Sequence, residues 1–329
     1  MSHEFDSGLF VGTPAWHGLG VVVQEAPTTA EALKLAQMDW SVTETDLTPV
    51  ECPGWKRLNR SDTGALLHVC RANWTPVQNV DAFRWFDPLI QDGDVALETA
   101  VSLAGGKRIA ILARIQGSTA EVLPGDSVEQ FLLLFNSHDG SLALGVKFTN
   151  TRVVCQNTLG MATQGEHSSF SGEMTWNGKS ARIKHTRNIQ SNLEAVRDAI
   201  DIQKRGWRYT LEEYQAMAKT PMTTALFRTY LERVFEKDLR KSKKSREGVP
   251  VSASDLMWYP DLENNFDAGI GINIPGVSGT VWAGYQAVSE FFTHQRGRSQ
   301  SSRLDNQWFG AGQKTLTEAH DQALVLTRS

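Results

Sequence analysis

The spacing of apolar and polar residues along the chain predicts a mixed α+β fold. Residues 131–135 form an unbroken apolar run, which is typical of a central strand covered on both faces. The turn signal Asp139-Gly140 follows, so the next apolar segment is expected to return as the partner strand of a β-hairpin. Alternation and apolar runs together predict strands over residues 40–45, 55–59, 66–71, 107–115, 129–136 and 142–149.

Helical spacing dominates the C-terminal half. Residues 28–31 and 210–213 both read Thr-x-x-Glu, the pattern of a capping box, and each predicts the start of a helix. Pro221 is suited to the first turn of another helix. Residues 152–159 are expected to lead from the hairpin into a short helix. The remaining helices are predicted over residues 80–90, 188–204, 281–294 and 316–326.

These elements predict a central antiparallel sheet with a β-hairpin followed by helices, and a mostly helical C-terminal half. The charges divide the chain into three parts. Residues 1–178, an α+β domain, hold 11 basic and 20 acidic residues, while residues 179–246, a basic helical segment, hold 17 and 8. Residues 247–329, an α-rich segment expected to pack back on the first domain, hold 5 and 9. The formal net charge of −4 therefore hides one strongly basic segment.

Composition excludes several broad classes of protein. With 40% apolar and 21% charged residues the chain resembles ordinary soluble proteins, and no apolar run is long enough to span a membrane. The first residues lack the pattern of a signal peptide. Three cysteines without CxxC spacing indicate neither a disulfide framework nor a zinc site. A cytoplasmic protein is expected.

Enzyme chemistry finds little support in the motifs. The Gly-rich residues 269–279 lack both GxxxxGK[ST] and GxGxxG, so we expect no nucleotide cofactor. The histidines show no HxH, HExxH or HxxxH spacing, so no metal is expected. His138 and Cys155 would be the minimum for a thiol nucleophile and its base if they converged in space. We expect no catalytic residue, and this Cys/His enzyme remains the third hypothesis.

The basic segment carries the strongest signal for a binding function. Cations bind phosphates by charge and counterion release, and the aromatic side chains of Trp176, Trp207 and Tyr209 could stack on unpaired bases. The opposing interpretation is a set of solvated helix faces paired with the acidic first part. The predicted DNA contacts are Lys107, Arg108, Lys147, Arg152, Arg182, Lys184, Arg187, Lys204, Arg205 and Arg208. A flexible secondary arm is predicted at Lys241, Lys243, Lys244 and Arg246.

Several short motifs carry a family resemblance. They include residues 12–20, 76–79, 98–100, 136–141, 152–159 and 280–283, within which lie His138, Asp139, Cys155 and Asn157. Together they resemble the phage/plasmid-related protein family, a domain of unknown function found on phages, prophages and conjugative plasmids. The resemblance implies a bacterial host cytoplasm and the DNA metabolism of mobile elements. The predicted architecture is also similar to that of the phage single-strand annealing proteins of the Redβ, RecT and Erf kinds, without a shared motif.

The leading hypothesis is therefore a protein that binds single-stranded DNA and promotes annealing or recombination without a cofactor. It would act as a ring or filament of identical subunits. A host or phage single-strand-binding protein or nuclease would be a further partner, and no membrane contact is expected. The alternative is an interaction or anti-defence protein of the same mobile elements, which would act on a host factor by protein contact.

Overall fold

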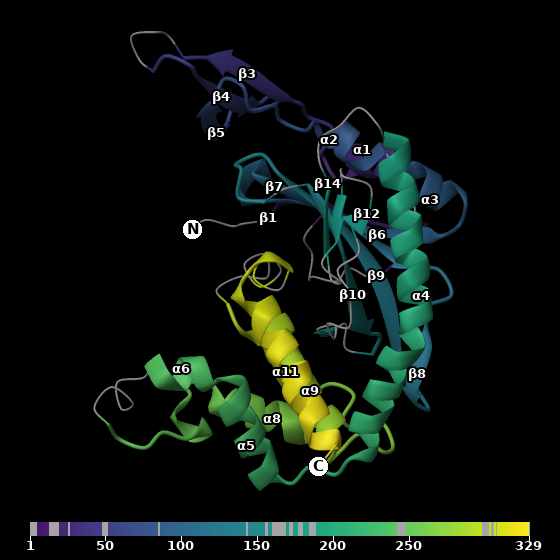
Figure 1. Ribbon diagram of the computed structural model, residues 1–329, viewed down its shortest axis with the longest axis vertical. Helices are drawn as coiled ribbons and strands as arrows, with labels where there is room; N and C mark the ends of the chain where they lie inside the picture. Colours follow the sequence, from purple (N-terminus) through teal and green to yellow (C-terminus); the bar gives the residue numbers. More distant parts are fainter. Residues whose placement is uncertain are drawn as a thin grey trace. The chain divides into compact units, whose positions relative to one another are not determined.

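The computed structural model confirms the α+β class, with 42% of residues helical and 28% in strands (Figure 1). It describes residues 5–12, 20–25, 27–47, 52–84, 86–142, 144–154, 157–159, 169–170, 174–176, 180–183, 189–241, 248–297, 303, 306 and 308–328. The chain forms two compact units. Unit 1 comprises residues 1–117, 131–148 and 163–203, and unit 2 comprises residues 118–130, 149–162 and 204–329.

Among the strand pairs whose register is described, the main sheet is antiparallel except for one parallel edge pair, and the predicted central strand lies inside it. Its order is β12-β13-β14-β10-β9-β7-β6-β1-β2. Within it, β9 (Asp126–Ser137) lies between β7 (Arg108–Ile115) and β10 (Gly145–Arg152), and its apolar residues from Phe131 to Leu134 are buried. The other strands are β1 (Phe5–Val11), β2 (Val21–Val23), β6 (Val95–Leu103), β12 (Ser169–Phe170), β13 (Met174–Trp176) and β14 (Ser180–Ile183), with β8 (Ala120–Leu123) on β9 and β11 (Asn157–Leu159) on β10.

A second, three-stranded sheet belongs to unit 1. It consists of β3 (Val42–Asp46), β4 (Trp55–Arg60) and β5 (Leu66–Arg71) in antiparallel order, which confirms the predicted hairpin (Figure 1). The helices of this unit are α1 (Thr29–Leu35), α2 (Asn79–Arg84) and α3 (Asp87–Gln91). The predicted capping box at the start of α1 is present, because Thr28 and Glu31 each accept a hydrogen bond from the other's backbone N–H.

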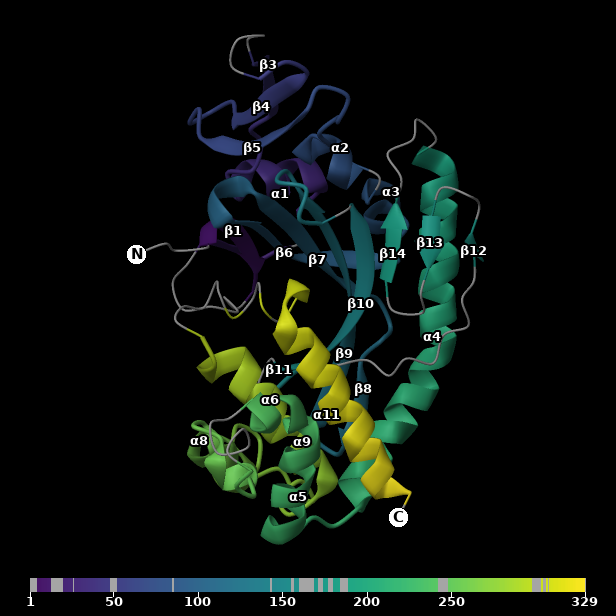
Figure 2. The same ribbon diagram turned by 60° about the vertical axis from the view of Figure 1, so that its left-hand side comes forward.

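Unit 2 builds its core from helices. These are α5 (Thr224–Val234), α6 (Glu236–Lys241), α8 (Tyr259–Ala268), α9 (Val281–Glu290), the π-helix η3 (Phe291–Gln295) and α11 (Ala311–Thr327), with a short turn η2 (Ala253–Asp255). Helices α9 and α11 pack against each other (Figure 2). Every residue of α9 is buried, including Trp282 and Tyr285. None of the helices that the structure describes is long and apolar enough to cross a membrane.

Two local predictions were wrong, and a third is only partly described. Residues 152–159 were expected to lead into a helix; β10 continues to Arg152 and β11 pairs beside it with Asn150 opposite Leu159, and residues 160–168 lie outside the described residues. Residues 210–213 start no helix, because α4 (Ile189–Lys219) runs through them. A single glycine at 206 weakens a helix by only about 1 kcal/mol, and the buried Trp207 and Tyr214 anchor this one. Pro221 precedes α5, whose N-cap is Thr223.

Candidate nucleic-acid interface

The second half of α4 carries the most accessible group of the predicted DNA contacts. Lys204, Arg205 and Arg208 are exposed, and the adjacent Tyr209 is 67% exposed. Residues four apart lie on one side of a helix, so Arg205 and Tyr209 form one pair of neighbours and Lys204 and Arg208 another. The arrangement presents three cations and one flat ring over less than two turns.

Neighbouring carboxylates partly offset the positive charge of this segment. Glu212 accepts a hydrogen bond from Arg208 Nε at 3.0 Å, one turn further along α4. Asp198 and Asp201 are exposed one turn or more before Lys204 and Arg205. Exposed ion pairs of this kind contribute about 0–1 kcal/mol, so a phosphate can displace the carboxylate at little cost.

Trp207, which was predicted to stack on a base, is buried in the structure. Its side chain is only 8% exposed and belongs to the core of unit 2, so it anchors α4 and presents no free ring to a base. Tyr209 is the ring of this segment that faces solvent. For Trp176 the structure describes only the backbone, in β13.

Lys107 and Arg108 lie half-buried where β7 begins, beside the predicted hairpin. The backbone oxygen of Lys107 accepts from His138 N–H at 2.8 Å, and Arg108 Nε donates to Ser141 Oγ at 3.2 Å. Asp139 lies in the same turn. Burial would raise the pKa of Asp139, but hydrogen bonds from Ser141 and the charge of Arg108 lower it.

Lys147 and Arg152 are not on the surface. Lys147 in β10 is 6% exposed, and burial lowers the pKa of its ammonium group to about 7. Arg152 at the end of β10 is 1% exposed. Neither side chain is accessible to a phosphate in this arrangement, so the prediction that these two contact DNA is not compatible with their placement.

A buried ion pair accounts for Arg152. Its Nε and Nη2 donate to the two carboxylate oxygens of Asp126 at 2.6 and 2.8 Å, and both side chains are almost fully buried. The backbone oxygens of Ile270 and Gly271 accept from Nη1 and Nη2 at 3.1 and 3.2 Å. Trp282 Nε1 donates to the same carboxylate at 2.9 Å. The guanidinium therefore joins β9, β10, the 269–276 loop and α9 within unit 2.

The Gly-rich loop at residues 269–276 packs against the Arg152 guanidinium of this ion pair. Gly271 has a φ of +79°, which favours glycine, and a Cβ there would lie 2.9 Å from Arg152 Nη2. The loop residues form turns, and two of their backbone oxygens bind Arg152. Gly271 thus allows the backbone to approach a buried cation.

His138 has a structural environment in unit 1. Its side chain is fully buried, and its Nε2 lies 2.8 Å from Asn79 Oδ1. The ring of Trp40 meets its edge at 5.4 Å between centroids, and Asn79 Nδ2 donates to the backbone oxygen of Trp40. Burial lowers the pKa of His138 to about 4, so the imidazole is neutral at pH 7. It links the hairpin turn to residues 38–42 and α2.

Acidification is expected to destabilise unit 1 through His138. Its folded-state pKa of about 4 lies below the unfolded value near 6.5, so the unfolded state binds more protons between these limits. Stability should fall by up to about 3 kcal/mol as the pH drops from 6.5 toward 4. Urea unfolding across this pH range measures the effect. His138→Gln should show a shallower pH dependence in this window, and parallel profiles would contradict the prediction.

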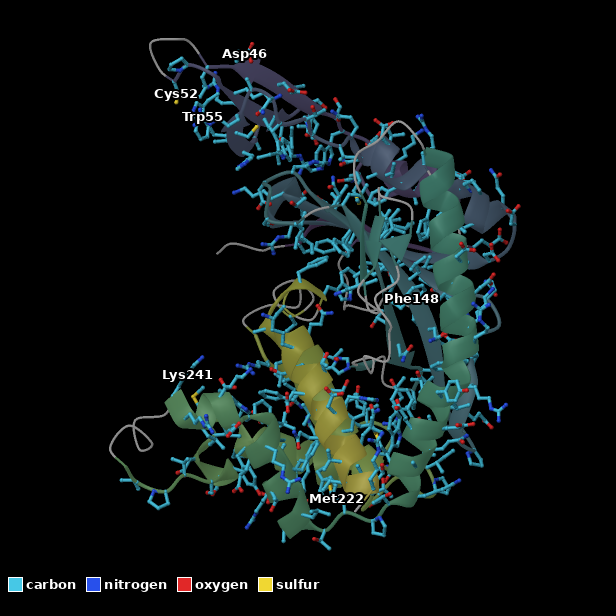
Figure 3. The ribbon with its side chains drawn as sticks, in the orientation of Figure 1. Asp46, Cys52, Trp55, Phe148, Met222 and Lys241 are labelled. Atoms are coloured by element: carbon cyan, nitrogen blue, oxygen red, sulfur yellow. The ribbon has the colours of Figure 1, made fainter. Side chains whose placement is uncertain are left out.

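The remaining predicted residues are only partly described. Arg182 lies in β14, where the structure describes the backbone, and Asn157 begins β11. Lys241, exposed, ends α6 (Figure 3). Lys184, Arg187, Lys243, Lys244, Arg246 and Cys155 lie outside the described residues, so the pairing of Cys155 with His138 stays a prediction. Within the described parts of the chain, no group of three or more His, Cys, Asp or Glu side chains could hold a metal ion.

Sequence reasoning missed Asp126 and Trp282 as partners of Arg152. Asp126 lies 26 positions from Arg152, and Trp282 lies 156 positions from Asp126, so no local spacing connects them. The available signal was the position of Arg152 at the end of a strongly apolar β-hairpin. A guanidinium buried there requires a carboxylate partner, although the sequence does not show which one.

Comparison with known proteins gives a family and no activity. Residues 66–308 match the model of a family described as a domain of unknown function (DUF932). No curated protein and no solved structure matches the chain.

Proposed function

The chain belongs to the DUF932 family of domains of unknown function, and we propose that it binds single-stranded DNA and promotes the annealing of complementary strands without a nucleotide cofactor. The observation that carries the proposal is the exposed cluster on α4, formed by Lys204, Arg205, Arg208 and Tyr209. We call it the α4 cluster. Three cations beside one accessible ring can hold a phosphate backbone while a base stacks on the tyrosine.

The chemistry of annealing suits such a surface. A protein that joins two complementary strands has to neutralise phosphates and leave the base-pairing edges free. Lys204 and Arg205 supply charge without reading a sequence, and Tyr209 supplies a face on which any base can stack. Lys107, Arg108, Arg182, Lys184 and Arg187 complete the proposed contact set, with the arm from Lys241 to Arg246 as a secondary one.

The biological setting is part of the same proposal. The motifs that resemble the phage/plasmid-related family favour a mobile genetic element in a bacterial cytoplasm. The architectural likeness to the phage single-strand annealing proteins favours a homo-oligomer, which we propose in the form of a ring or filament. The interaction or anti-defence protein remains the alternative, and a partner that stays bound after nuclease treatment would favour it.

Reversing two charges of the α4 cluster tests this function. Lys204→Glu combined with Arg205→Glu should weaken binding to a labelled oligo-dT and reduce the slope of log K against log salt by about 1.4, because each lost phosphate contact on a single strand removes about 0.7. Fluorescence anisotropy at several salt concentrations measures both quantities.

The matched control changes the same total charge elsewhere in unit 2. Lys314→Glu with Arg328→Glu alters two exposed cations at the two ends of α11. This control should retain the slope of the natural protein. Equal losses in the two double variants would mean that net charge alone drives binding, and the α4 cluster would lose its assigned role.

A further inference from the structure

One face of the three-stranded sheet in unit 1 combines an aromatic ring with two cations. Residues directly opposite each other in an antiparallel sheet share a face. The register pairs Trp55 with Arg71 and Arg57 with both Val69 and Thr45. We call this surface the Trp55 face. Its members are Thr43, Thr45, Trp55, Arg57, Asn59, Leu66, Val69 and Arg71.

The Trp55 face is open to solvent. Arg57 and Arg71 are exposed, and Trp55 is half-buried. Leu66 is 52% exposed and Val69 is 37% exposed, although both are apolar. Figure 3 labels Trp55, which begins β4 of this sheet. Adjacent exposed apolar and aromatic side chains on one sheet face are typical of a binding surface.

The opposite face of the same sheet packs against the rest of unit 1, and its cations are paired with carboxylates. Lys56 is ion-paired with Glu44, and Arg60 is ion-paired with Asp6 and Asp62. Leu58 and Cys70 are buried there, and the ring of His68 lies against Gly140 of the hairpin turn. The sheet therefore has a fixed orientation on unit 1, and the alternation of side chains directs its other face outward.

Charge distinguishes the two faces. Glu44 and Asp46 alternate with Thr43 and Thr45, so the carboxylates of β3 belong to the packed face. Neither Arg57 nor Arg71 has a carboxylate partner among the described residues. The Trp55 face is thus positive, whereas the parts of the chain before residue 179 are acidic as a whole. A polyanion is the ligand that complements such a surface.

The guanidinium of Arg71 lies over one face of the Trp55 ring, and together they form a stacking platform. Arg71 Cζ lies 4.5 Å from the centre of the Trp55 ring, within the range of a cation–π contact. Unpaired bases stack on aromatic rings and on arginine planes, and sheet faces that bind single strands use this chemistry. A duplex keeps its bases stacked inside, so it cannot use such a platform. Thr43 Oγ1 and Asn59 Nδ2 donate to the backbone oxygens of Asn59 and Gly64. The exposed hydroxyl of Thr45 adds a hydrogen-bond group that suits phosphates and base edges.

We propose that the Trp55 face is a second binding surface for single-stranded DNA, on which a base stacks against Trp55 and Arg71 while Arg57 holds a phosphate. The inference rests on the proposed function and names a separate surface for it. Trp55 and Arg57 precede residue 66, where the match to the family begins, whereas Arg71 lies within the matched residues.

The test compares a normal oligo-dT with an abasic oligonucleotide of the same length, which keeps the phosphates and lacks the bases. The full chain should bind oligo-dT more tightly than the abasic strand. Trp55→Ala should weaken oligo-dT binding by about tenfold, because one base stack is lost, and should leave abasic binding almost unchanged. Trp55→Phe, which keeps a ring, should restore most of the preference.

Two further variants separate the possible outcomes. Arg57→Glu should weaken binding to both strands, and it tests the face even if Trp55→Ala fails to fold. Arg84→Ala is the control, because Arg84 is exposed on α2 in the same unit and outside the face. If the natural protein binds oligo-dT and the variants at 55 and 57 bind it equally well, the Trp55 face is not a DNA surface, although the proposed function stands. If the natural protein binds neither strand, both proposals fail.

Discussion

Replacing Arg152 by methionine is expected to destabilise the protein by about 3–5 kcal/mol, since the change leaves the Asp126 carboxylate buried without its counter-charge. Trp282 Nε1 would still donate to that carboxylate, but one neutral donor does not balance the charge. Urea unfolding followed by tryptophan fluorescence measures the loss.

A double-variant cycle identifies the cause of this loss. Asp126→Leu alone should also be strongly destabilising, because it leaves a buried guanidinium unpaired. Arg152→Met combined with Asp126→Leu should be less destabilising than the sum of the two single changes, since no charge stays buried. Additive effects would contradict a coupled ion pair. Recovery will be incomplete, because the backbone oxygens of Ile270 and Gly271 lose their donor.

Trp282→Ala is the second change with a large expected effect. The ring is fully buried and packs against Tyr214 and Tyr285 at centroid distances of 5.0 and 5.9 Å. Its removal leaves a large cavity and takes one donor from Asp126, so the free energy of unfolding should fall by about 3–5 kcal/mol. The same unfolding experiment checks this value.

A graded variant divides the effect of Trp282 into packing and hydrogen bonding. Trp282→Phe keeps much of the ring volume and loses Nε1, so it should cost about 1–3 kcal/mol. If the phenylalanine and alanine variants are equally unstable, the hydrogen bond to Asp126 outweighs packing. If phenylalanine is neutral, the bond contributes nothing measurable.

Features with local causes could be predicted from the sequence. The apolar run at 131–135 identified β9 as a central strand, and Thr28 with Glu31 identified the start of α1. A capping-box pattern did not suffice at residues 210–213, because Gly206 does not interrupt α4 and the buried Trp207 and Tyr214 stabilise a continuous helix. The same local pattern therefore has two outcomes, and tertiary packing decides between them.

Which basic residues form a binding surface depends on tertiary structure more than on local sequence. A basic residue in a strand pattern can face solvent or a buried carboxylate, and only the fold shows that Arg152 does the latter. The cations at 204, 205 and 208 were predicted as DNA contacts, but the predicted helix ended at residue 204, and only the fold shows that α4 continues and leaves them exposed. The hairpin at residues 55–71 was predicted as well, but its outward face is set by the packing of Lys56, Leu58 and Arg60 on the rest of unit 1.

Binding of single-stranded DNA as a function of salt tests the central proposal most directly. The full chain, without nucleotide or metal, is titrated into a fluorescein-labelled oligo-dT at salt concentrations from about 50 to 200 mM, the range over which phosphate contacts change affinity strongly. The proposed function predicts saturable binding whose log K falls linearly with log salt, with a slope of about −0.7 for each neutralised phosphate. An absence of binding at the lowest salt concentration would contradict it.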